Sequence, residues 1–378
     1  MTLYLDHHAT TPCDPRVLEA MLPYFTGQFG NPSSAYHLPG RTAAKALDTA
    51  REQVAALLNA QPQEIIFTSG ATESNNLAIL GLTQTLPPQR RRIVTTRIEH
   101  KAVLEPCRVL AERGFEVVYL PLERDGRVRV DEALELIDDQ TLLVSIQSAN
   151  SEVGTLQPLE PLFAHAKDQG AYTHCDATQS VGHLAIDIQT LPVDLLSLSG
   201  HKLYAPKGCG ALFMRRSSPR IPLKPLMFGG AQEGHLRPGT ENVPYLVGLG
   251  LACVLAGQEM VGATHLRDLR DALERGLKEA IPEIRFNGSR QHRLPGNSSV
   301  TLPGVEADAL LLNLPEIALS IGSACNSGAM EPSYVLTALG LTREEADQTF
   351  RVGLGRTTQR LDVEMAVQQI TSAYLRLI

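Results

Sequence analysis

Four stretches of the sequence place groups that can do chemistry among small residues, directly after a short apolar run. They read Thr68-Ser69-Gly70-Ala71-Thr72-Glu73-Ser74, Gln147-Ser148-Ala149-Asn150, Asp176-Ala177-Thr178-Gln179 and Ser199-Gly200-His201-Lys202. Each apolar run has the length and composition of a buried strand. Because ligands of open parallel sheets bind beyond the carboxyl ends of the strands, we expect the four stretches to border one cleft.

Asp176 and Lys202 could together serve a cofactor with a pyridine ring and an aldehyde. A buried carboxylate is costly unless it is paired, and a protonated pyridine nitrogen is a suitable partner for Asp176. Partial desolvation would favour the uncharged amine of Lys202, the form that condenses with an aldehyde. Each residue also has a plainer interpretation, since Asp176 could cap a helix and most loop lysines are solvated. The hypothesis depends on the two occurring together.

The stretch after Phe67 predicts an anion site. Small residues open a predicted helix there, so free backbone N–H groups and the positive end of the helix dipole would face an anion, with the Thr72 hydroxyl added. Ser199 and His201 could help to hold a phosphate. A helix cap without any ligand would explain serine and threonine at these positions equally well.

His100 and Asn150 follow two further predicted strands and complete the rim of the cleft. The imidazole of His100 could stack on a cofactor ring or transfer a proton beside it. Asn150 could donate a hydrogen bond to a ring hydroxyl. The plainer alternatives are a surface histidine and an ordinary turn asparagine.

The elements that must position these groups alternate between strands and helices from about residue 45, which is typical of a parallel α/β sheet. The predicted strands are 65–68, 93–96, 116–120, 142–146, 171–175, 195–198 and 210–214, and the predicted helices between them include 41–58, 74–81, 102–113 and 159–169. After about residue 243 a long helix-prone stretch reaches residue 280, and a final helix is predicted at 363–377. This change predicts a smaller carboxy-terminal domain.

Composition excludes several classes of protein. The chain of 378 residues is 43% hydrophobic and 20% charged, as in ordinary globular proteins. Its net charge of -7, without long blocks of one sign, argues against a nucleic-acid binder. No apolar run approaches the ~20 residues that span a bilayer, and the amino terminus lacks the features of a secretory signal. We therefore expect a cytoplasmic protein with no membrane or nucleic-acid partner.

The six cysteines, at positions 13, 107, 175, 209, 253 and 325, form no C-x-x-C pair and have no zinc or disulfide spacing. We expect no metal site. Buried thiols are common in cores, so most of the six are predicted to be packing residues.

Taken in order, these motifs closely resemble those of the cysteine desulfurases of the NifS and IscS type, a class-V branch of the fold-type-I pyridoxal-phosphate enzymes. The likeness runs from Tyr4-Leu5-Asp6-His7-His8-Ala9-Thr10-Thr11-Pro12 to Arg351-Val352-Gly353-Leu354-Gly355-Arg356 and includes Ser323-Ala324-Cys325-Asn326-Ser327-Gly328. It implies an α/β fold with a mostly parallel seven-stranded sheet in a large cofactor-binding domain, 15–250. Residues 1–14 and 251–378 would form a smaller α/β domain that carries the cysteine loop.

The resemblance also implies a role for each matching residue. Lys202 would bind pyridoxal 5'-phosphate covalently, Asp176 would pair with the ring nitrogen and His100 would stack over the ring. The other implied cofactor contacts are Ala71, Thr72, Asn150, Gln179, Ser199, His201 and, from the second subunit of a homodimer, Thr240. Asn31 and Arg351 would receive the substrate, with the guanidinium of Arg351 binding its carboxylate.

The implied activity is the conversion of L-cysteine to L-alanine. The thiolate of Cys325 would attack the substrate sulfur and keep it as a persulfide. An acceptor protein, such as an iron-sulfur scaffold, would then take the sulfur for cluster or thio-cofactor synthesis. At an ordinary pKa near ~8.5 only about 3% of the thiol is ionised at pH 7, so we expect activation by a neighbour such as His100.

Alternatives remain open at this level. An aminotransferase, or a selenocysteine or cysteine lyase, on the same scaffold would have the same lysine and aspartate, but a transaminase does not need Cys325. A sulfur-relay protein with a vestigial cofactor site is a third hypothesis. Two departures from the family pattern carry no assigned mechanism, namely His7-His8, where relatives often have Asn or Tyr, and Ser151, where a second Asn is common.

Overall fold

Seven strands form the large sheet of the computed structural model, which describes residues 2–84, 90–260, 263–322 and 331–378. Their order is β2-β8-β7-β6-β5-β3-β4, and β8 runs in the opposite direction to the other six. The strands are β2 (Ile65–Thr68), β3 (Arg92–Thr95), β4 (Glu116–Tyr119), β5 (Thr141–Ser145), β6 (Tyr172–Asp176), β7 (Leu195–Ser199) and β8 (Gly210–Met214). The predicted mostly parallel seven-stranded sheet is confirmed.

Helices cover both faces of the large sheet because its strands are apolar on both sides. In β2, Ile65 and Phe67 belong to one buried cluster and Ile66 to another. The first face is covered by α1 (Pro15–Met21), α3 (Leu38–Leu58), α6 (Val130–Leu136), α7 (Leu159–Asp168) and α8 (Val243–Glu259), and the second by α4 (Ala71–Thr83) and α5 (Lys101–Glu112). Short helical turns are α2 (Pro23–Thr26), η1 (Pro62–Glu64), η2 (Gly200–Lys202) and η3 (Gln232–His235).

Helix α3 begins three residues before the predicted start at residue 41. His37 caps it by accepting the N–H of Gly40 on Nδ1 at 3.0 Å. Pro39 lies in the first turn, where a missing N–H costs nothing. A side chain on Gly40 would place its Cβ 2.0 Å from the carbonyl oxygen of Ser34, so the Pro-Gly pair begins this helix instead of breaking it.

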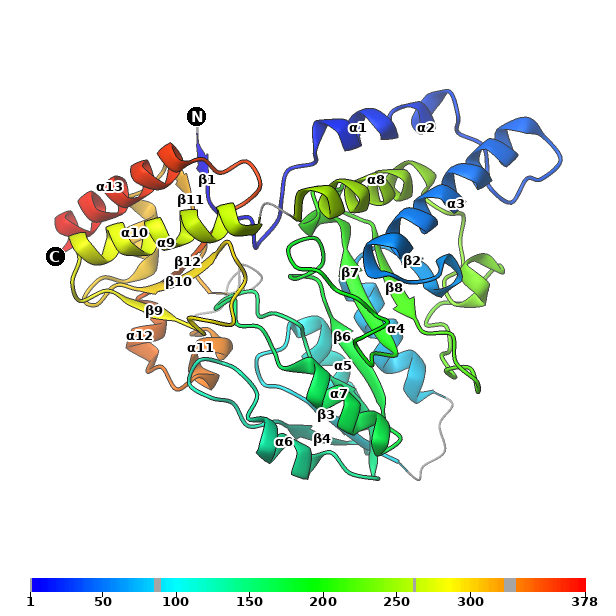
Figure 1. Cartoon of the computed structure of the whole chain (residues 1–378), viewed down its shortest axis with the longest axis horizontal. Coiled ribbons are helices and arrows are strands. Elements are labelled where there is room, and N and C mark those ends of the chain that lie inside the picture. Colours follow the sequence, from blue (N-terminus) through cyan, green and yellow to red (C-terminus); the bar gives the residue numbers. More distant parts are fainter. Residues whose placement is uncertain (1, 85–89, 261–262, 323–330) are drawn as a thin grey trace.

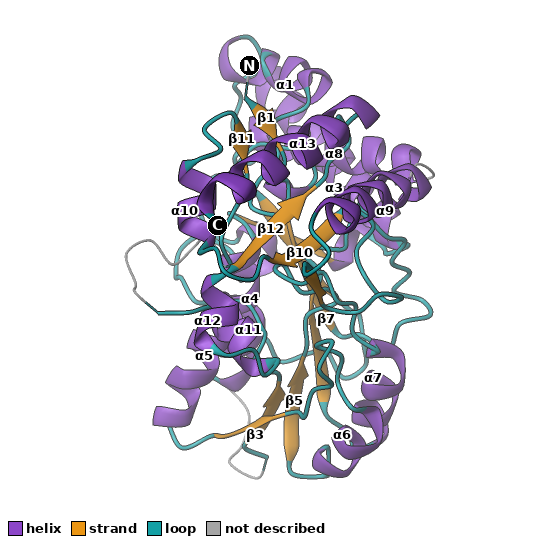
Figure 2. Ribbon diagram, turned by 90° about the vertical axis from the view of Figure 1, so that its left-hand side faces the viewer, coloured by secondary structure: helices purple, strands orange, loops and turns teal. Residues whose placement is uncertain are grey.

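A second group of elements lies beside the large sheet (Figures 1 and 2). Its small sheet is antiparallel, in the order β12-β10-β9, and β1 pairs in parallel with β11 in a separate two-stranded sheet. The elements are β1 (Leu3–Tyr4), β9 (Arg285–Asn287), β10 (Asn297–Thr301), β11 (Ile317–Ala318), β12 (Thr349–Gly353), α9 (Ala263–Ala280), α10 (Ala307–Leu312), α11 (Tyr334–Ala338), α12 (Arg343–Asp347) and α13 (Arg360–Leu377). The first residues of the chain therefore pack with the carboxy-terminal part.

The division of the chain into domains at residue 250 stays a prediction. Helix α8 continues past that point, and its Cys253 and Ala256 are buried in the core of the large sheet. Within the described ranges no single helix is long and apolar enough to cross a membrane, although α8 and α9 together, bent by 74°, meet that criterion of length and composition.

The core of the small sheet gives a stability prediction. Phe350 of β12 is fully buried in it, whereas Leu312 of α10 is 83% exposed. Phe350→Ala should lower the free energy of unfolding by about 3–5 kcal/mol, because it removes an aromatic ring and leaves a cavity. Leu312→Ala should change it by less than about 0.5 kcal/mol. Urea denaturation of both variants tests the assignment, and equal losses would contradict it.

Candidate active site

A cavity of about 520 Å³ lies at the carboxyl ends of β2, β3, β5, β6 and β7. Residues of the amino-terminal segment and Arg351 of β12 form its opposite wall. The predicted site residues that line it are Ala71, Thr72, His100, Asp176, Gln179, Ser199, His201, Lys202 and Arg351. The structure thus brings together nine side chains from five separate stretches of the sequence.

The turn between β2 and α4 forms one end of the cavity. The N–H groups of the first turn of a helix have no intrahelical acceptors, so those of α4 are available to an anion. Gly70 precedes the helix with φ of +148°, a conformation that favours glycine. A Cβ on Gly210 would lie 2.6 Å from the Cα of Gly70, so β8 can pass this turn only because it has glycine there. Thr72 and Ser199 add hydroxyl groups to the same wall.

His201 lies at this end of the cavity as a neutral ring. Burial lowers its pKa to about 4, with Lys202, Lys207 and His100 acting in the same direction. Its Nδ1 lies 3.1 Å from the hydroxyl of Thr10. An uncharged imidazole can donate one N–H to an anion without adding charge.

The carboxylate of Asp176 is fixed at the end of β6. Asn75 of α4 donates from Nδ2 to its Oδ2 at 2.7 Å, and the N–H of Thr178 donates to its Oδ1 at 3.0 Å. Asn75 was not predicted as a site residue, because its burial and its hydrogen bond to a residue 101 positions away are visible only in the fold.

His174 lies below Asp176 in the same strand. Its Nδ1 lies 2.8 Å from the Ser145 hydroxyl, and its Nε2 lies 3.1 Å from the Ser197 hydroxyl. Burial lowers the pKa of His174 to about 4, although the charge of Asp176 acts in the opposite direction. The floor of the site is therefore a neutral, hydrogen-bonded layer.

Lys202 brings a buried amine into the cavity from η2. Its Nζ donates to the backbone carbonyls of His8 and Ala9, the latter at 2.8 Å. The amino-terminal segment thus lies directly over the lysine and holds its amine at the wall of the cavity.

The turn that carries Lys202 is held from behind by Tyr204, whose φ of 62° is uncommon for a residue with a side chain. The N–H of Tyr204 donates to the Thr11 hydroxyl at 3.0 Å. Its own hydroxyl accepts the N–H of Arg356 at 2.6 Å and lies 3.4 Å from Nδ1 of His7. These contacts fasten the turn to the amino-terminal segment and to the chain after β12.

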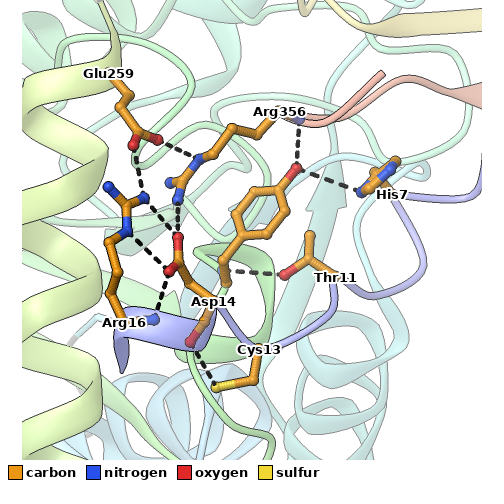
Figure 3. A network of polar contacts seen from close by, with 8 residues as sticks. His7, Thr11, Cys13, Asp14, Arg16, Glu259 and Arg356 are labelled. Atoms are coloured by element: carbon orange, nitrogen blue, oxygen red, sulfur yellow. Dashed lines mark hydrogen bonds and ion pairs between the residues drawn. The ribbon is translucent and has the colours of Figure 1, made fainter. Parts of the chain in front are cut away.

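Arg356 is the centre of an ion-pair network that joins three parts of the chain (Figure 3). Its guanidinium pairs with Asp14, just before α1, at 3.0 Å and with Glu259, at the end of α8, at 2.5 Å. Arg16 pairs with the same two carboxylates at 2.7 and 2.8 Å. Chiefly through its hydrogen bond from Arg16, the pKa of Asp14 falls to about 2, so the network is charged at neutral pH.

Arg351 supplies a buried cation from the small sheet. Its Nη2 pairs with Asp6 at 2.8 Å and donates to the Ser320 hydroxyl at 2.6 Å, and its Nη1 donates to the carbonyl of Ser151 at 2.9 Å. These contacts fix the guanidinium plane against the cavity. Its Nε has no partner among the residues described.

His100 and its neighbour Glu99 connect β3 to the cavity. His100 caps α5 by accepting the N–H of Ala102 on Nδ1 at 3.0 Å, which leaves the proton of the neutral ring on Nε2. Glu99 is fully buried and accepts hydrogen bonds from Thr96 at 2.7 Å and from the N–H of Gln147 at 2.8 Å. Burial raises the pKa of Glu99 well above its ordinary value, and the sequence analysis gave it no role.

Three predicted site residues of the described ranges are not part of the cavity wall, namely Asn150, Asn31 and Thr240. The Oδ1 of Asn150 accepts the N–H groups of the two residues after Ser151, and its Nδ2 donates to the carbonyl of Ile98 at 2.9 Å, so this side chain fixes its own turn and joins it to the segment after β3. Asn31 is exposed and caps a turn in the same way. Thr240 is exposed outside the cavity, and its contact with a second subunit stays a prediction. Cys325 lies outside the described residues.

Several buried polar atoms of the cavity wall lack a partner within the described residues. They include Nε2 of His8, Oγ1 of Thr178 and Nε of Arg351. Buried polar groups without hydrogen bonds are costly, so such atoms indicate that a polar ligand belongs in this cavity. A ligand with a cationic ring nitrogen for Asp176, a carbonyl for Lys202 and an anionic group for the start of α4 fits the groups present.

The class-V aminotransferase family matches residues 3–365 of the chain. Among curated proteins, the mitosomal cysteine desulfurase of Trachipleistophora hominis is 47% identical over 99% of this chain and 86% of its own length. Among solved structures, a NifS-like protein superposes with a TM-score of 0.93 at 36% identity, over 100% of both chains. A second structure, described as SspA in complex with cysteine, has a TM-score of 0.81 at 38% identity, over 94% of this chain and 99% of the other.

The buried histidine below Asp176 predicts a pH dependence of stability. Because the pKa of His174 falls from 6.5 to about 4 on folding, the unfolded chain binds a proton there between these pH values while the folded chain does not. The free energy of unfolding should therefore fall as the pH is lowered from 6.5 to 4.

His174→Gln removes this titration. Between pH 6.5 and 4 the free energy of unfolding of this variant should therefore fall less than that of the unaltered protein, by up to a few kcal/mol. Other buried histidines act with the same sign in both proteins, and the difference between the two slopes isolates His174. The exposed His292→Gln is the control and should keep the original slope. Equal slopes for all three proteins, measured by urea denaturation at each pH, would contradict the assignment.

Proposed function

Because the chain belongs to the class-V aminotransferase family and, within it, to the cysteine desulfurases of the NifS type, we propose that it converts L-cysteine to L-alanine and retains the sulfur as a persulfide on Cys325. The observation that carries this proposal is the convergence of Lys202, Asp176 and Arg351 on one cavity. These side chains provide an amine for a carbonyl, a carboxylate for a ring nitrogen and a cation for the carboxylate of an amino acid.

Pyridoxal phosphate is the proposed cofactor. When bound, it supplies an aldehyde that takes up the substrate amino group and a ring that accepts the electrons of the bond broken at Cα. Asp176, oriented by Asn75, would pair with the ring nitrogen. The N–H groups of Ala71 and Thr72 and the side chains of Thr72, Ser199 and His201 would hold the phosphate. His100 and Gln179 would contact the ring.

Lys202 would have two roles. It would hold the cofactor covalently before the substrate arrives, and its displaced amine would then remain in the cavity as a base for the Cα proton. The carbonyls of His8 and Ala9 accept hydrogen bonds from this amine and limit where it can move. The ion-pair network behind Tyr204 keeps the backbone of this turn in place.

Arg351 would orient the substrate by its carboxylate. Its guanidinium is already fixed by Asp6 and Ser320, so little side-chain freedom is lost when the substrate binds. The pairing with Asp6 also limits the charge that Arg351 presents, which favours a carboxylate in direct contact over anions at a distance.

Sulfur transfer would follow at the substrate's Cβ. The thiolate of Cys325 attacks the substrate sulfur, so that an S–S bond forms as the C–S bond breaks. The hydrogen of the Cys325 thiol ends on the alanine product, and the sulfur stays on the enzyme in the persulfide. His100, whose Nδ1 caps α5, would exchange a proton in this step through its Nε2.

A homodimer is part of the proposal. The segment from Leu22 to Leu38 carries five exposed large apolar side chains, with Phe29 at 72% and Tyr36 at 101% exposure, and Phe228 is 87% exposed. Exposed apolar groups of this size favour burial against another protein surface. A second copy of the chain would cover them and bring its Thr240 to the cavity.

The sulfur acceptor is proposed to be another protein, such as an iron-sulfur scaffold, because the sulfur must leave Cys325 before the next turnover. The cytoplasm is the proposed location for this exchange.

The test of the proposed function is a visible spectrum of the purified protein, followed by an assay of products from L-cysteine with excess dithiol present. The proposal predicts a yellow protein that releases alanine and sulfide in equal amounts. A yellow protein that makes pyruvate or transfers the amino group would move the function to a lyase or an aminotransferase. A colourless protein that binds no pyridoxal phosphate would contradict the cofactor.

The role of Cys325 predicts a separation of steps. Cys325→Ser should keep the yellow colour and the spectral response to L-cysteine, because the cavity is intact, but should lose sulfide release to the background level. Cys13→Ser is the matched control, since Cys13 is a partly exposed thiol outside the cavity, and it should release sulfide normally. Sulfide release by Cys325→Ser at the unaltered rate would show that another thiol is the nucleophile.

A further inference from the structure

His8 is a residue of the cavity wall that the roles proposed above do not use. Its imidazole is 5% exposed and lies between Gln179 of the large-sheet side and Gly353 of β12. A Cβ on Gly353 would come within 3.0 Å of Cδ2 of His8 and of the N–H of His7, so the strand has room for this ring only because glycine stands there. The ring is therefore closely confined.

Gln179 fixes the tautomer of His8. The amide of Gln179 donates from Nε2 to the backbone carbonyl of His8 at 3.2 Å, and its Oε1 lies 3.1 Å from Nδ1 of the imidazole. Since a carbonyl oxygen only accepts, Nδ1 must carry the ring proton and donate it. The other nitrogen, Nε2, then has a lone pair, and it has no partner among the described residues.

The imidazole of His8 stays uncharged at working pH. Burial is the largest cause that lowers its pKa well below 6.5, and the charges of Arg351 from β12, His183 from the turn after β6 and Lys202 from η2 act in the same direction. The hydrogen bond with Gln179 acts in the opposite direction. His8 therefore offers a neutral hydrogen-bond acceptor inside the cavity.

The chemistry of the substrate limits what this acceptor can meet. A carboxylate has no hydrogen to donate and is drawn to Arg351. The amino group has N–H donors, and it must replace the amine of Lys202 at the carbonyl of the cofactor. That amine lies against the backbone carbonyl of His8 itself, so the exchange takes place beside this residue.

We propose that Nε2 of His8 accepts a hydrogen bond from the amino group of the amino-acid substrate and so selects amino acids over other small carboxylates. This inference rests on the proposed function, because it needs a substrate that exchanges with Lys202. Arg351 and His8 then recognise the two ends of the same zwitterion.

Two substitutions separate the nitrogens of the ring. His8→Asn keeps a donor at the position of Nδ1, facing Gln179, but has no atom at the position of Nε2. His8→Gln places an acceptor oxygen near the position of Nε2. Two binding probes are used. L-alanine has the amino group, whereas 3-mercaptopropionate has the carboxylate and the thiol of L-cysteine but no amino group.

Calorimetry on the cofactor-loaded protein measures the Kd of each probe. His8→Asn should raise the Kd of L-alanine, and the KM of L-cysteine, about tenfold, as expected for one lost hydrogen bond, and His8→Gln should restore part of the loss. Neither variant should change the Kd of 3-mercaptopropionate more than about twofold. His7→Asn is the matched control, because His7 is the adjacent buried imidazole and its contact is with Tyr204, so it should leave the ratio of the two Kd values unchanged.

An equal loss of affinity for both probes in His8→Asn, or no loss for either, would overturn the inference. Thermal melting of each variant shows whether a loss reflects damage to the fold. If the unaltered protein makes no alanine from L-cysteine, the proposed function fails first, whereas an active protein whose His8→Asn variant binds L-alanine normally refutes the role of His8 alone.

Discussion

The parallel direction of six strands of the large sheet determines where the chemistry of this protein lies. Each parallel strand ends at the same edge, so the residues that follow β2, β3, β5, β6 and β7 meet there although they are far apart in the sequence. The reversed strand β8 returns the chain past the same edge through Gly210. Every group assigned to the cofactor from the large-sheet part depends on this convergence.

The second half of the site comes from outside the large sheet. The amino-terminal segment crosses from β1 to α1 and places the carbonyls of His8 and Ala9 over Lys202, while β12 supplies Arg351. The pair of Arg351 with Asp6 and the network around Arg356 tie these parts together. The pair of Arg351 with Asp6 is largely buried, and because breaking a buried pair leaves an uncompensated charge, it favours one arrangement of these parts over others.

The architecture of the large sheet was predictable because its signals are local. The strands are short apolar runs and the helices between them have clear periodicity, so each predicted strand lies within one residue of the observed one. The small sheet was not predicted in detail. Its strand β10 reads Asn297-Ser298-Ser299-Val300-Thr301, and nothing in that polar run indicates that all five residues are buried.

The residues that would contact the cofactor were largely predictable, but the residues that hydrogen-bond to them and fix the surrounding turns were not. Lys202, Asp176 and the start of α4 follow strands directly and so have a sequence signal. Asn75 and Glu99 act through hydrogen bonds to residues about 50 to 100 positions away, which one sequence cannot reveal. Asn150 was predicted to contact the cofactor, but the hydrogen bonds of its side chain are made to its own turn and to Ile98.

Trapping the cofactor on the protein is the most direct test of the account. Borohydride reduction of the yellow protein, followed by peptide mapping with mass spectrometry, would identify the lysine that is bonded to the cofactor. We expect to find the label on Lys202, which is buried at the wall of the cavity. The label on Lys207, the other lysine of the cavity wall, would contradict the central assignment, as would a protein that takes up no label.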